Sequence, residues 1–332
     1  MHHGKNSIML RSCAMLAVLA AAVAVTAAPA WSQNYPSKPV RFIFPYAPGG
    51  TTEILARQIG TKVSASLGQP FLVEARPGAG GNVGTDQVVK SSPDGYTLLL
   101  GASGPLAINV SLFKSLPYDP TVDLVPIVHA ASVPLILVSG QGFQAKTVKE
   151  LIAMLKARPE GIPYASAGIG TPQHLSAELF KLMANVPGTH VPYKGSGPAI
   201  IDLIGGQVPF GFESMLVALA QVKGGKLRAI AMTAGKRSPL MPDVPTMAEA
   251  GVPGYESIAW YGVVAPKGTP APIVKLLNAE MRKALTAPDV AKWLAEQGSA
   301  NVAGTPEQFG AFIKAEIGKW AKVVKASGAV AE

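Results

Sequence analysis

The chain has 332 residues, of which 48% are hydrophobic and 15% are charged. This composition excludes an intrinsically disordered chain, and the length favours two lobes over a single core. The formal net charge of +9 suits an anionic solute, although it could also serve solubility alone. Because the lysines and arginines are scattered, with no aromatic-rich basic stripe, nucleic acid is not expected as a partner.

The first 30 residues have the three-part pattern of an export signal. Lys5 and Arg11 form the positive region, residues 14–27 are apolar, and small residues around Ala30 form the cleavage site. A membrane anchor is the alternative, but the apolar run is shorter than the ~20 residues that a spanning helix needs. We therefore expect cleavage near Ala30, a periplasmic location, and loss of Cys13, the single cysteine.

Segments with strand and helix patterns alternate along the rest of the chain. In the first part, strands are expected at residues 40–44, 71–73 and 97–100, and a helix at residues 52–67. This alternation predicts an α/β fold with a largely parallel sheet. The loops at the carboxyl ends of such strands gather on one edge, where ligands bind.

The same alternation restarts near Gly140. Further strands are expected at residues 135–138, 163–166, 191–193, 208–212, 227–233 and 260–266. Further helices are expected at residues 147–157, 171–182, 198–204, 271–285, 289–297 and 305–327. The restart predicts two lobes, one formed by residues 34–135 with 256–332 and the other by residues 136–255. Crossing segments near residues 133–139 and 255–259 would join them.

One short turn carries the strongest functional signal. The first strand runs through Tyr46 into Pro48-Gly49-Gly50, and a helix begins at once with Thr51 and Thr52. Such a turn leaves backbone N–H groups uncovered at a helix N-terminus, where the helix dipole adds positive potential, so the turn suits an anion. The alternative is an ordinary tight turn in which a threonine caps the helix.

A second turn of the same kind follows a later strand. Its residues are Ser166-Ala167-Gly168-Ile169, after which Thr171 can cap a helix. His174 lies in the first turn of that helix, where it could donate to an anion or contribute to the cap. Two such turns predict one shared site, in which opposed helix N-termini hold a carboxylate through backbone hydrogen bonds.

Other motifs favour neither a nucleotide nor a metal. Residues 76–84 are rich in glycine, but they fit neither the Walker pattern nor G-x-G-x-x-G, so we expect them to pack at the rim of a cleft. His129, His174 and His190 lack the spacing of a metal site, and no thiolate is available after cleavage. We therefore expect no metal and no cofactor, and a buried structural role for His129.

Catalytic residues are not expected either. Ser103 lies in a segment that resembles a nucleophile elbow but lacks the final glycine of G-x-S-x-G. Glu53 and Glu213 could form an acid–base pair, although Glu53 is better placed to stabilise its helix N-terminus and Glu213 to end a strand near the cleft. A carboxylester hydrolase that uses Ser103 and His174 is the enzymatic alternative.

A set of motifs occurs in order along nearly the whole chain after the signal. It comprises the Pro-Gly-Gly-Thr-Thr turn and residues 35–41, 76–82, 93–98, 193–195, 205–208, 242–246, 253–256 and 265–270. With these motifs the chain resembles the Bug (Bordetella uptake gene) family. That family includes the TctC proteins, the periplasmic solute receptors of tripartite tricarboxylate transporters.

The resemblance implies a two-lobed, type II periplasmic binding protein with crossing strands, which closes on its ligand like a flytrap. It also implies that the loops at 46–52 and 166–171 hold the ligand carboxylate through backbone groups and bridging waters. Tyr46 and Ile169 would form an apolar wall, which points to an aromatic or longer aliphatic carboxylate. The candidate ligand-binding residues are Tyr46, Pro48, Gly49, Gly50, Thr51, Thr52, Asn82, Ser103, Ser166, Ala167, Gly168, Ile169, Thr171, His174, Tyr193 and Glu213.

The function implied is non-enzymatic. We expect a monomeric receptor that captures a di-, tri- or aromatic carboxylate and delivers it to membrane transporter subunits. The alternative is an exported ligand sensor, which would use the same closing receptor to signal across the membrane. Glu53 and Glu213 stand where the family often has aspartate, and their roles stay open.

Overall fold

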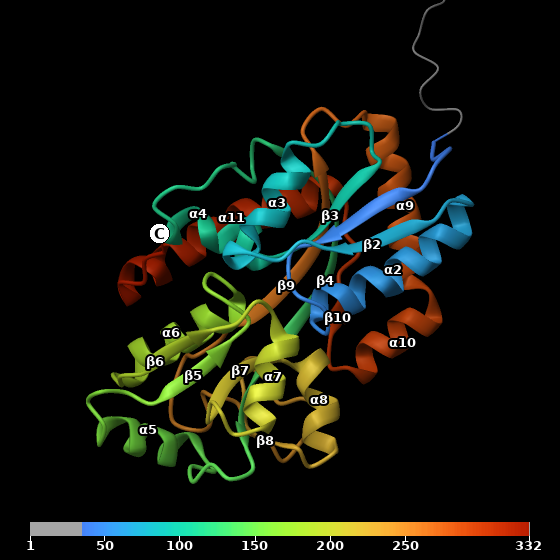
Figure 1. The fold of residues 1–332 in the computed structure, drawn as a ribbon. Helices are drawn as coiled ribbons and strands as arrows, with labels where there is room; N and C mark the ends of the chain where they lie inside the picture. Colours follow the sequence, from blue (N-terminus) through green and yellow to red (C-terminus); the bar gives the residue numbers. More distant parts are fainter. Residues whose placement is uncertain (1–34, 332) are drawn as a thin grey trace, which may run out of the picture. The chain divides into compact units, whose positions relative to one another are not determined.

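The computed structural model describes residues 35–331, so the predicted export signal lies outside the described residues. From Lys38 onward the chain forms one unit, built on a single ten-stranded sheet (Figure 1). Among the described residues, no helix is long and apolar enough to cross a membrane.

One end of the sheet, the first half-sheet, collects strands from distant parts of the chain. In spatial order it consists of β2 (Phe71–Ala75), β1 (Val40–Phe44), β3 (Thr97–Ala102), β9 (Ile258–Pro266) and the start of β4 (Leu124–Gly140). The strands β2, β1 and β3 are parallel, whereas β9 pairs antiparallel with both β3 and β4. α2 (Thr51–Leu67) connects β1 to β2, and α3 (Asn82–Val89) connects β2 to β3. The loops that follow the three parallel strands therefore meet at one edge.

The other end, the second half-sheet, repeats this arrangement. It consists of the end of β4 together with β7 (Phe210–Ser214), β8 (Leu227–Met232), β5 (Pro163–Ser166) and β6 (Thr189–Pro192). β5 lies parallel to both β6 and β7, while β4 is antiparallel to β7 and β8. α6 (Pro172–Ala184) follows β5, and α7 (Ser196–Ile204) follows β6. The short β10 (Ala300–Asn301) pairs with β4.

A single long strand runs through both half-sheets. β4 has 17 residues, and its pairing with β9 extends to Val133 opposite Ala259 and Pro134 opposite Ile258. The two segments predicted to cross are therefore hydrogen-bonded to each other. The exact division into two lobes stays a prediction, because the chain from Lys38 onward forms one unit.

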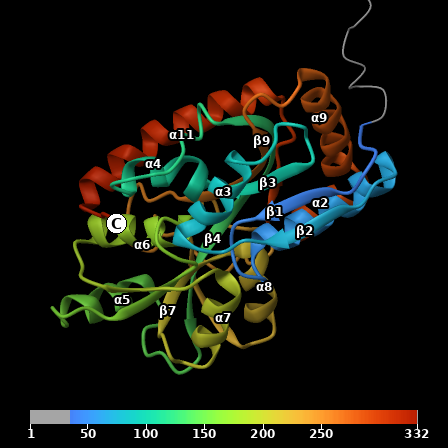
Figure 2. The same cartoon turned by 45° about the horizontal axis from the view of Figure 1, so that its top comes forward.

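Helices cover both half-sheets. Around the first lie α9 (Ala271–Thr286), α10 (Pro288–Glu296), α11 (Pro306–Ser327), the short helical segments η1 (Ala79–Gly81) and η2 (Gly104–Ile108), and α4 (Asn109–Leu112). α11 runs across one face of this half-sheet (Figure 2). Around the second lie α5 (Val148–Lys156), α6, α7 and α8 (Met215–Lys223) (Figure 1).

Each half-sheet has its own apolar core. One core is centred on Trp260, Trp320 and Phe309, and the other on residues that include Phe180 and Phe212. His129 belongs to the first core region, where it is 5% exposed and stacks on Phe312 with ring centroids 4.6 Å apart. Its buried structural role therefore agrees with the expectation from the sequence.

Candidate functional site

Three helices begin at one small cavity between the half-sheets, which we call the inner cavity. It encloses about 20 Å³, room for about one water molecule. Its lining includes the first residues of α2, α6 and α7, together with residues from the adjoining strands and turns. The lining residues are Tyr46, Gly50, Thr51, Thr52, Ala102, Ala167, Thr171, Pro172, Gln173, Ser196 and Tyr261.

The way these helices begin leaves backbone donors uncovered. Gly50 precedes α2 and Gly195 precedes α7, and neither position supplies a side-chain cap. α6 differs, because the Thr171 hydroxyl oxygen accepts a hydrogen bond of 3.3 Å from the His174 N–H. First-turn N–H groups without caps, together with the positive ends of three helix dipoles, create a positive potential in the cavity.

The Gly49 N–H, which we expected from the sequence to bind a ligand, donates instead to the Glu53 side chain. The Glu53 carboxylate accepts a 2.7 Å hydrogen bond from the Gly49 N–H and a 2.8 Å hydrogen bond from Arg57. Partial burial acts to raise the pKa of Glu53, but these hydrogen bonds outweigh it and the pKa is lowered. Glu53 therefore stabilises the start of α2, as expected from its position, and it occupies the Gly49 N–H.

A pair of stacked histidines supports the second turn. The rings of His174 and His190 lie parallel with centroids 4.0 Å apart. His174 Nδ1 accepts a 3.2 Å hydrogen bond from the Gly170 N–H, and His190 Nε2 lies 2.6 Å from the Ser166 hydroxyl. Burial lowers the pKa of His174 to about 4 and that of His190 to about 3, so both rings are neutral near pH 7.

A second space, the outer cavity, adjoins the inner one. It encloses about 220 Å³ and shares Tyr46 and Ala167 with the inner cavity. Ile169, Tyr193, Phe113 and other apolar groups give it a largely apolar wall. The full lining is Tyr46, Gly78, Ala79, Gly80, Gly81, Phe113, Ala167, Gly168, Ile169, Pro192, Tyr193, Lys194 and Ala331.

The two half-sheets contact each other closely around both cavities. The Ala47 N–H donates to the Lys194 carbonyl at 2.8 Å, and the Thr51 hydroxyl donates to the Ser214 hydroxyl at 2.7 Å. Gly80 has a positive φ of 62°, and a Cβ at this position would collide with the Ile169 carbonyl oxygen. The loops of the two half-sheets therefore meet in a closed arrangement.

Glu213 lies buried among the residues that line the inner cavity. It is 0% exposed, and among the described residues no group makes a hydrogen bond of good geometry to either carboxyl oxygen, although Ser196, Gln173 and the Ser214 N–H lie near. Burial raises its pKa to about 7, and nearby Ser196 and Gln173 oppose this only in part. Its negative charge also acts on Tyr261. A carboxyl group with no cation to pair with thus adjoins a cavity that otherwise favours anions.

The predicted residues divide into three groups by position. The inner cavity is lined by Tyr46, Gly50, Thr51, Thr52, Ala167 and Thr171. The outer cavity adds Gly168, Ile169 and Tyr193. Neither lining includes Pro48, Gly49, Asn82, Ser103, Ser166, His174 or Glu213. A ligand-binding role for any of these residues stays a prediction.

Asn82 and Ser103 have surroundings that suit structural roles. The Asn82 side-chain oxygen accepts hydrogen bonds from Asn109 at 2.6 Å and from Tyr118 at 2.9 Å. Ser103 is 0% exposed, and within residues 35–331 its hydroxyl has no hydrogen-bond partner, neither a histidine nor a carboxylate.

Five residues that line the inner cavity were missed from the sequence: Ala102, Pro172, Gln173, Ser196 and Tyr261. A signal for Ser196 exists, because Gly195-Ser196-Gly197 precedes a helix just as the other two turns do. The predicted start of that helix at Pro198 placed Ser196 outside it, whereas α7 begins at Ser196. Gln173 and Tyr261 carry no comparable local signal.

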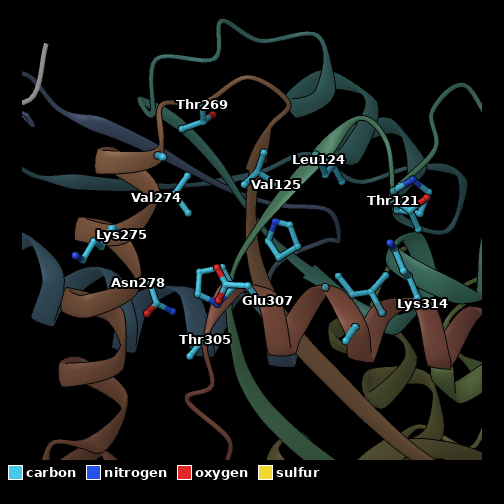
Figure 3. Close-up of a pocket in the computed structure, with 17 residues that line it drawn as sticks. Thr121, Leu124, Val125, Thr269, Val274, Lys275, Asn278, Thr305, Glu307 and Lys314 are labelled. Carbon is cyan, nitrogen blue, oxygen red and sulfur yellow. The ribbon is translucent and has the colours of Figure 1, made fainter. Parts of the chain in front are cut away.

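A third cavity, larger than the inner and outer cavities, lies elsewhere, between α9, α11 and β4, and encloses about 910 Å³ (Figure 3). No predicted site residue lines it. Two of its polar residues are engaged within the fold: Asn278 donates to the Ile127 carbonyl at 2.7 Å, and Thr305 caps α11 with Gln308. Among the described residues, no group of three or more His, Cys, Asp or Glu side chains could hold a metal ion.

Comparison with known proteins identifies relatives over nearly the full length. Residues 55–329 match the TctC family, described as "Tripartite tricarboxylate transporter family receptor". Protein BugT of Bordetella pertussis is 42% identical over 322 residues, which cover 97% of this chain and 98% of BugT. The resemblance inferred from the motifs is therefore confirmed.

Solved structures confirm the fold class. The structure of "R. palustris Rpa4515 with adipate" has a TM-score of 0.87 and 37% identity, covering 89% of this chain and 99% of that one. The structure of "MatC (Rpa3494) from Rhodopseudomonas palustris with bound malate" has a TM-score of 0.84 and 34% identity, covering 87% and 100%. The α/β architecture is thus that of periplasmic solute-binding proteins.

Proposed function

The chain belongs to the TctC family of tripartite tricarboxylate transporter receptors, and on this premise we propose that it captures one small organic carboxylate outside the cytoplasm and delivers it to membrane subunits of such a transporter. The observation that carries the proposal is the convergence of three helix N-termini on the inner cavity. The arrangement suits a carboxylate, because the donors come from the backbone and need no arginine.

The ligand carboxylate binds in the inner cavity. N–H groups from the first turns of α2 and α7 donate to it, and the start of α6 adds its dipole. Each hydrogen bond from the backbone to a charged acceptor contributes roughly 1.5–3 kcal/mol. The Ser196 hydroxyl, which accepts a hydrogen bond from Gln173, adds a side-chain donor at the same place.

The remainder of the ligand extends into the outer cavity. Its volume of about 220 Å³ and its wall of Tyr46, Ile169 and Phe113 suit an aliphatic or aromatic chain. The related structures named with adipate and malate support a carboxylate as the class of ligand.

Binding requires the half-sheets to separate and close again. The inner cavity, at about 20 Å³, has no room for a carboxylate with its attached chain. Two lobes, residues 34–135 with 256–332 and residues 136–255, would rotate about β4 and β9, the strands that run between them. A ligand that contacts both sides shifts the population toward the closed form, which the membrane subunits then recognise.

No chemistry accompanies this cycle. A hydrolase that uses Ser103 and His174 lacks an activated serine, since the Ser103 hydroxyl has no hydrogen-bond partner. An exported sensor would use the same closure, and no observation favours it over transport.

Calorimetric titration tests the proposal. The purified chain without its first 30 residues is titrated near pH 6 with adipate, malate and benzoate, and with choline as a cationic control. We expect saturable binding of at least one carboxylate at one molecule per chain, and none of choline. A ligand at ~100 times its Kd stabilises the fold by ~2.7 kcal/mol, which thermal unfolding detects. Binding of choline alone would contradict the proposal.

A further inference from the structure

Glu213 is an exception within a site built for anions. It is the last residue but one of β7, next to the inner cavity, and is fully buried; among the described residues, no group makes a hydrogen bond of good geometry to its carboxyl oxygens. The groups that act on it include Ser196 and Gln173, which also line that cavity. A ligand carboxylate in the inner cavity would therefore lie close to a second carboxyl group.

The groups around Glu213 supply no positive charge to offset it. The charge of Glu213 acts on Tyr261 from β9, and Tyr46 lies beyond Tyr261. On α6, the titratable residue that follows Gln173 is His174. Burial keeps both tyrosines protonated by raising their pKa values above the usual range, and it keeps His174 neutral by lowering its pKa to about 4. α7 presents Ser196 and α2 presents Thr51, which are also neutral.

Two carboxylates in one desolvated space cannot both stay ionised, because their repulsion is weakly screened there. One of the two must take a proton. The ligand carboxylate has the free N–H groups of α2 and α7 to stabilise its charge. The Glu213 carboxylate has only nearby Ser196, Gln173 and the Ser214 N–H, which do not offset the cost of its burial. The proton therefore belongs on Glu213.

We propose that Glu213 takes up a proton when a carboxylate enters the inner cavity, and that its protonated carboxyl group then donates a hydrogen bond toward the ligand, directly or through one water. The inference rests on the proposed function of the same site. It assigns Glu213 the role of coupling the affinity for the ligand to pH.

The coupling has a definite direction. Before binding, the pKa of Glu213 is about 7, and a neighbouring carboxylate raises it further. Well below pH 7 the group is already protonated, so the affinity is independent of pH. Above pH 7 each binding event takes up a proton from solvent, and the affinity falls as pH rises.

Calorimetry of the chain without its first 30 residues measures this directly. Adipate, malate and benzoate are titrated near pH 6 and near pH 8, both above the carboxyl pKa values of all three, in two buffers of different ionisation enthalpy. For each compound that binds, we expect Kd to rise about tenfold between these pH values, with uptake of more than about half a proton per ligand near pH 8. His174 and His190 do not contribute, because both are neutral throughout this range.

Two variants test which residue takes up the proton when the ligand binds. Glu213→Gln should bind with similar affinity at both pH values and with no proton uptake, since an amide donates a hydrogen bond without titrating. Glu53→Gln is the matched control at the same cavity, because the lowered pKa of Glu53 keeps it ionised throughout. Whatever its effect on affinity, proton uptake should equal that of the unmodified chain. If Glu213→Gln does not fold, Glu213→Asp should retain the uptake with a shifted midpoint.

The outcomes separate the inference from the proposed function. Carboxylate binding with a pH-independent Kd and no proton uptake overturns the role of Glu213 and leaves the receptor function intact. Undiminished uptake in Glu213→Gln overturns it as well. If none of the three carboxylates binds near pH 6, the proposed function itself fails, and the inference fails with it.

Discussion

At the scale of single residues, Thr171 combines two tasks that sequence alone could not separate. It lines the inner cavity, and its hydroxyl also donates to the Gly168 carbonyl at 2.7 Å while accepting from the His174 N–H. The hydroxyl therefore holds the second turn in shape and caps α6. Any effect of this side chain on binding acts through the position of the turn.

Thr171→Ala should weaken both the fold and binding. Loss of an N-cap threonine costs about 1 kcal/mol of unfolding free energy, and the loosened turn should raise Kd for the carboxylate. Thr171→Ser is the matched control, since it keeps the hydroxyl. Urea unfolding and calorimetry of both variants measure the two effects, and an alanine variant with unchanged stability and unchanged Kd would refute this role.

Glu213 should also leave a signature in stability without any ligand. Its pKa is raised from 4.5 to about 7 in the folded chain. The folded state therefore binds more protons than the unfolded state between these values, and stability falls as pH rises through that window, by on the order of 3 kcal/mol. Glu213→Gln should remove this loss.

The measurement is the difference in unfolding free energy between Glu213→Gln and the unmodified chain, taken near pH 4.5 and near pH 8. We expect the unfolding free energy of the variant, relative to that of the unmodified chain, to be larger near pH 8 than near pH 4.5. An equal difference at both values would show that Glu213 is ionised normally in the folded state.

At the scale of elements, the site is a meeting of helix starts, and α7 is the one that the sequence analysis placed incorrectly. Gly195, just before α7, has a φ of 150°, and a Cβ there would lie 3.1 Å from the Ala47 nitrogen of the opposite half-sheet. The start of α7 and the first turn thus approach each other backbone to backbone. Closure depends on that approach.

Gly195→Ala should impair closure while the fold stays intact. We expect Kd for the bound carboxylate to rise by about tenfold or more, because the added methyl group prevents the backbones from meeting. Gly206→Ala, at the far end of α7, is the control: it also has a positive φ of 72° but nothing within 4 Å. If both variants bind alike, close approach at Gly195 does not matter for binding.

Local patterns predicted most elements, because the periodicity of a strand or a helix depends only on residues that are close together in the sequence. The predicted cap at Thr171 is present in the structure. β4 was predicted only from residue 135, although it begins at Leu124. Pro126 and Pro134 obscure its first part, since proline normally marks the edge or the end of a strand.

The candidate site was predictable only where it is local. The turns around Gly50 and Ala167 follow from glycine before a helix start. Gln173 and Tyr261 reach the cavity because α6 and β9 pack against distant parts of the chain, and no short pattern encodes that packing. The pKa of Glu213 likewise depends on complete burial, which only the folded chain reveals.

At the scale of the whole unit, the account depends on opening and closing. The hydrogen bond from Ala47 to Lys194 joins the two half-sheets at the rim of the outer cavity. A ligand can enter only when such contacts break. A covalent link at this point should therefore trap the closed form.

Ala47→Cys combined with Lys194→Cys provides that link. Without the first 30 residues the chain has no other cysteine. We expect the oxidised double variant to lose carboxylate binding and to recover it on reduction, whereas each single variant binds in both conditions. Binding that is equally fast and tight in the oxidised double variant would contradict a requirement for opening.

The central claim is that a ligand carboxylate lies between the starts of α2, α6 and α7. A crystal structure of the chain with the tightest binder among adipate, malate and benzoate tests it most directly. The account predicts one carboxylate in the inner cavity, within hydrogen-bond distance of first-turn N–H groups of α2 and α7, and the remainder of the molecule in the outer cavity. A carboxylate bound instead in the cavity between α9 and α11, with the inner cavity unchanged, would contradict it.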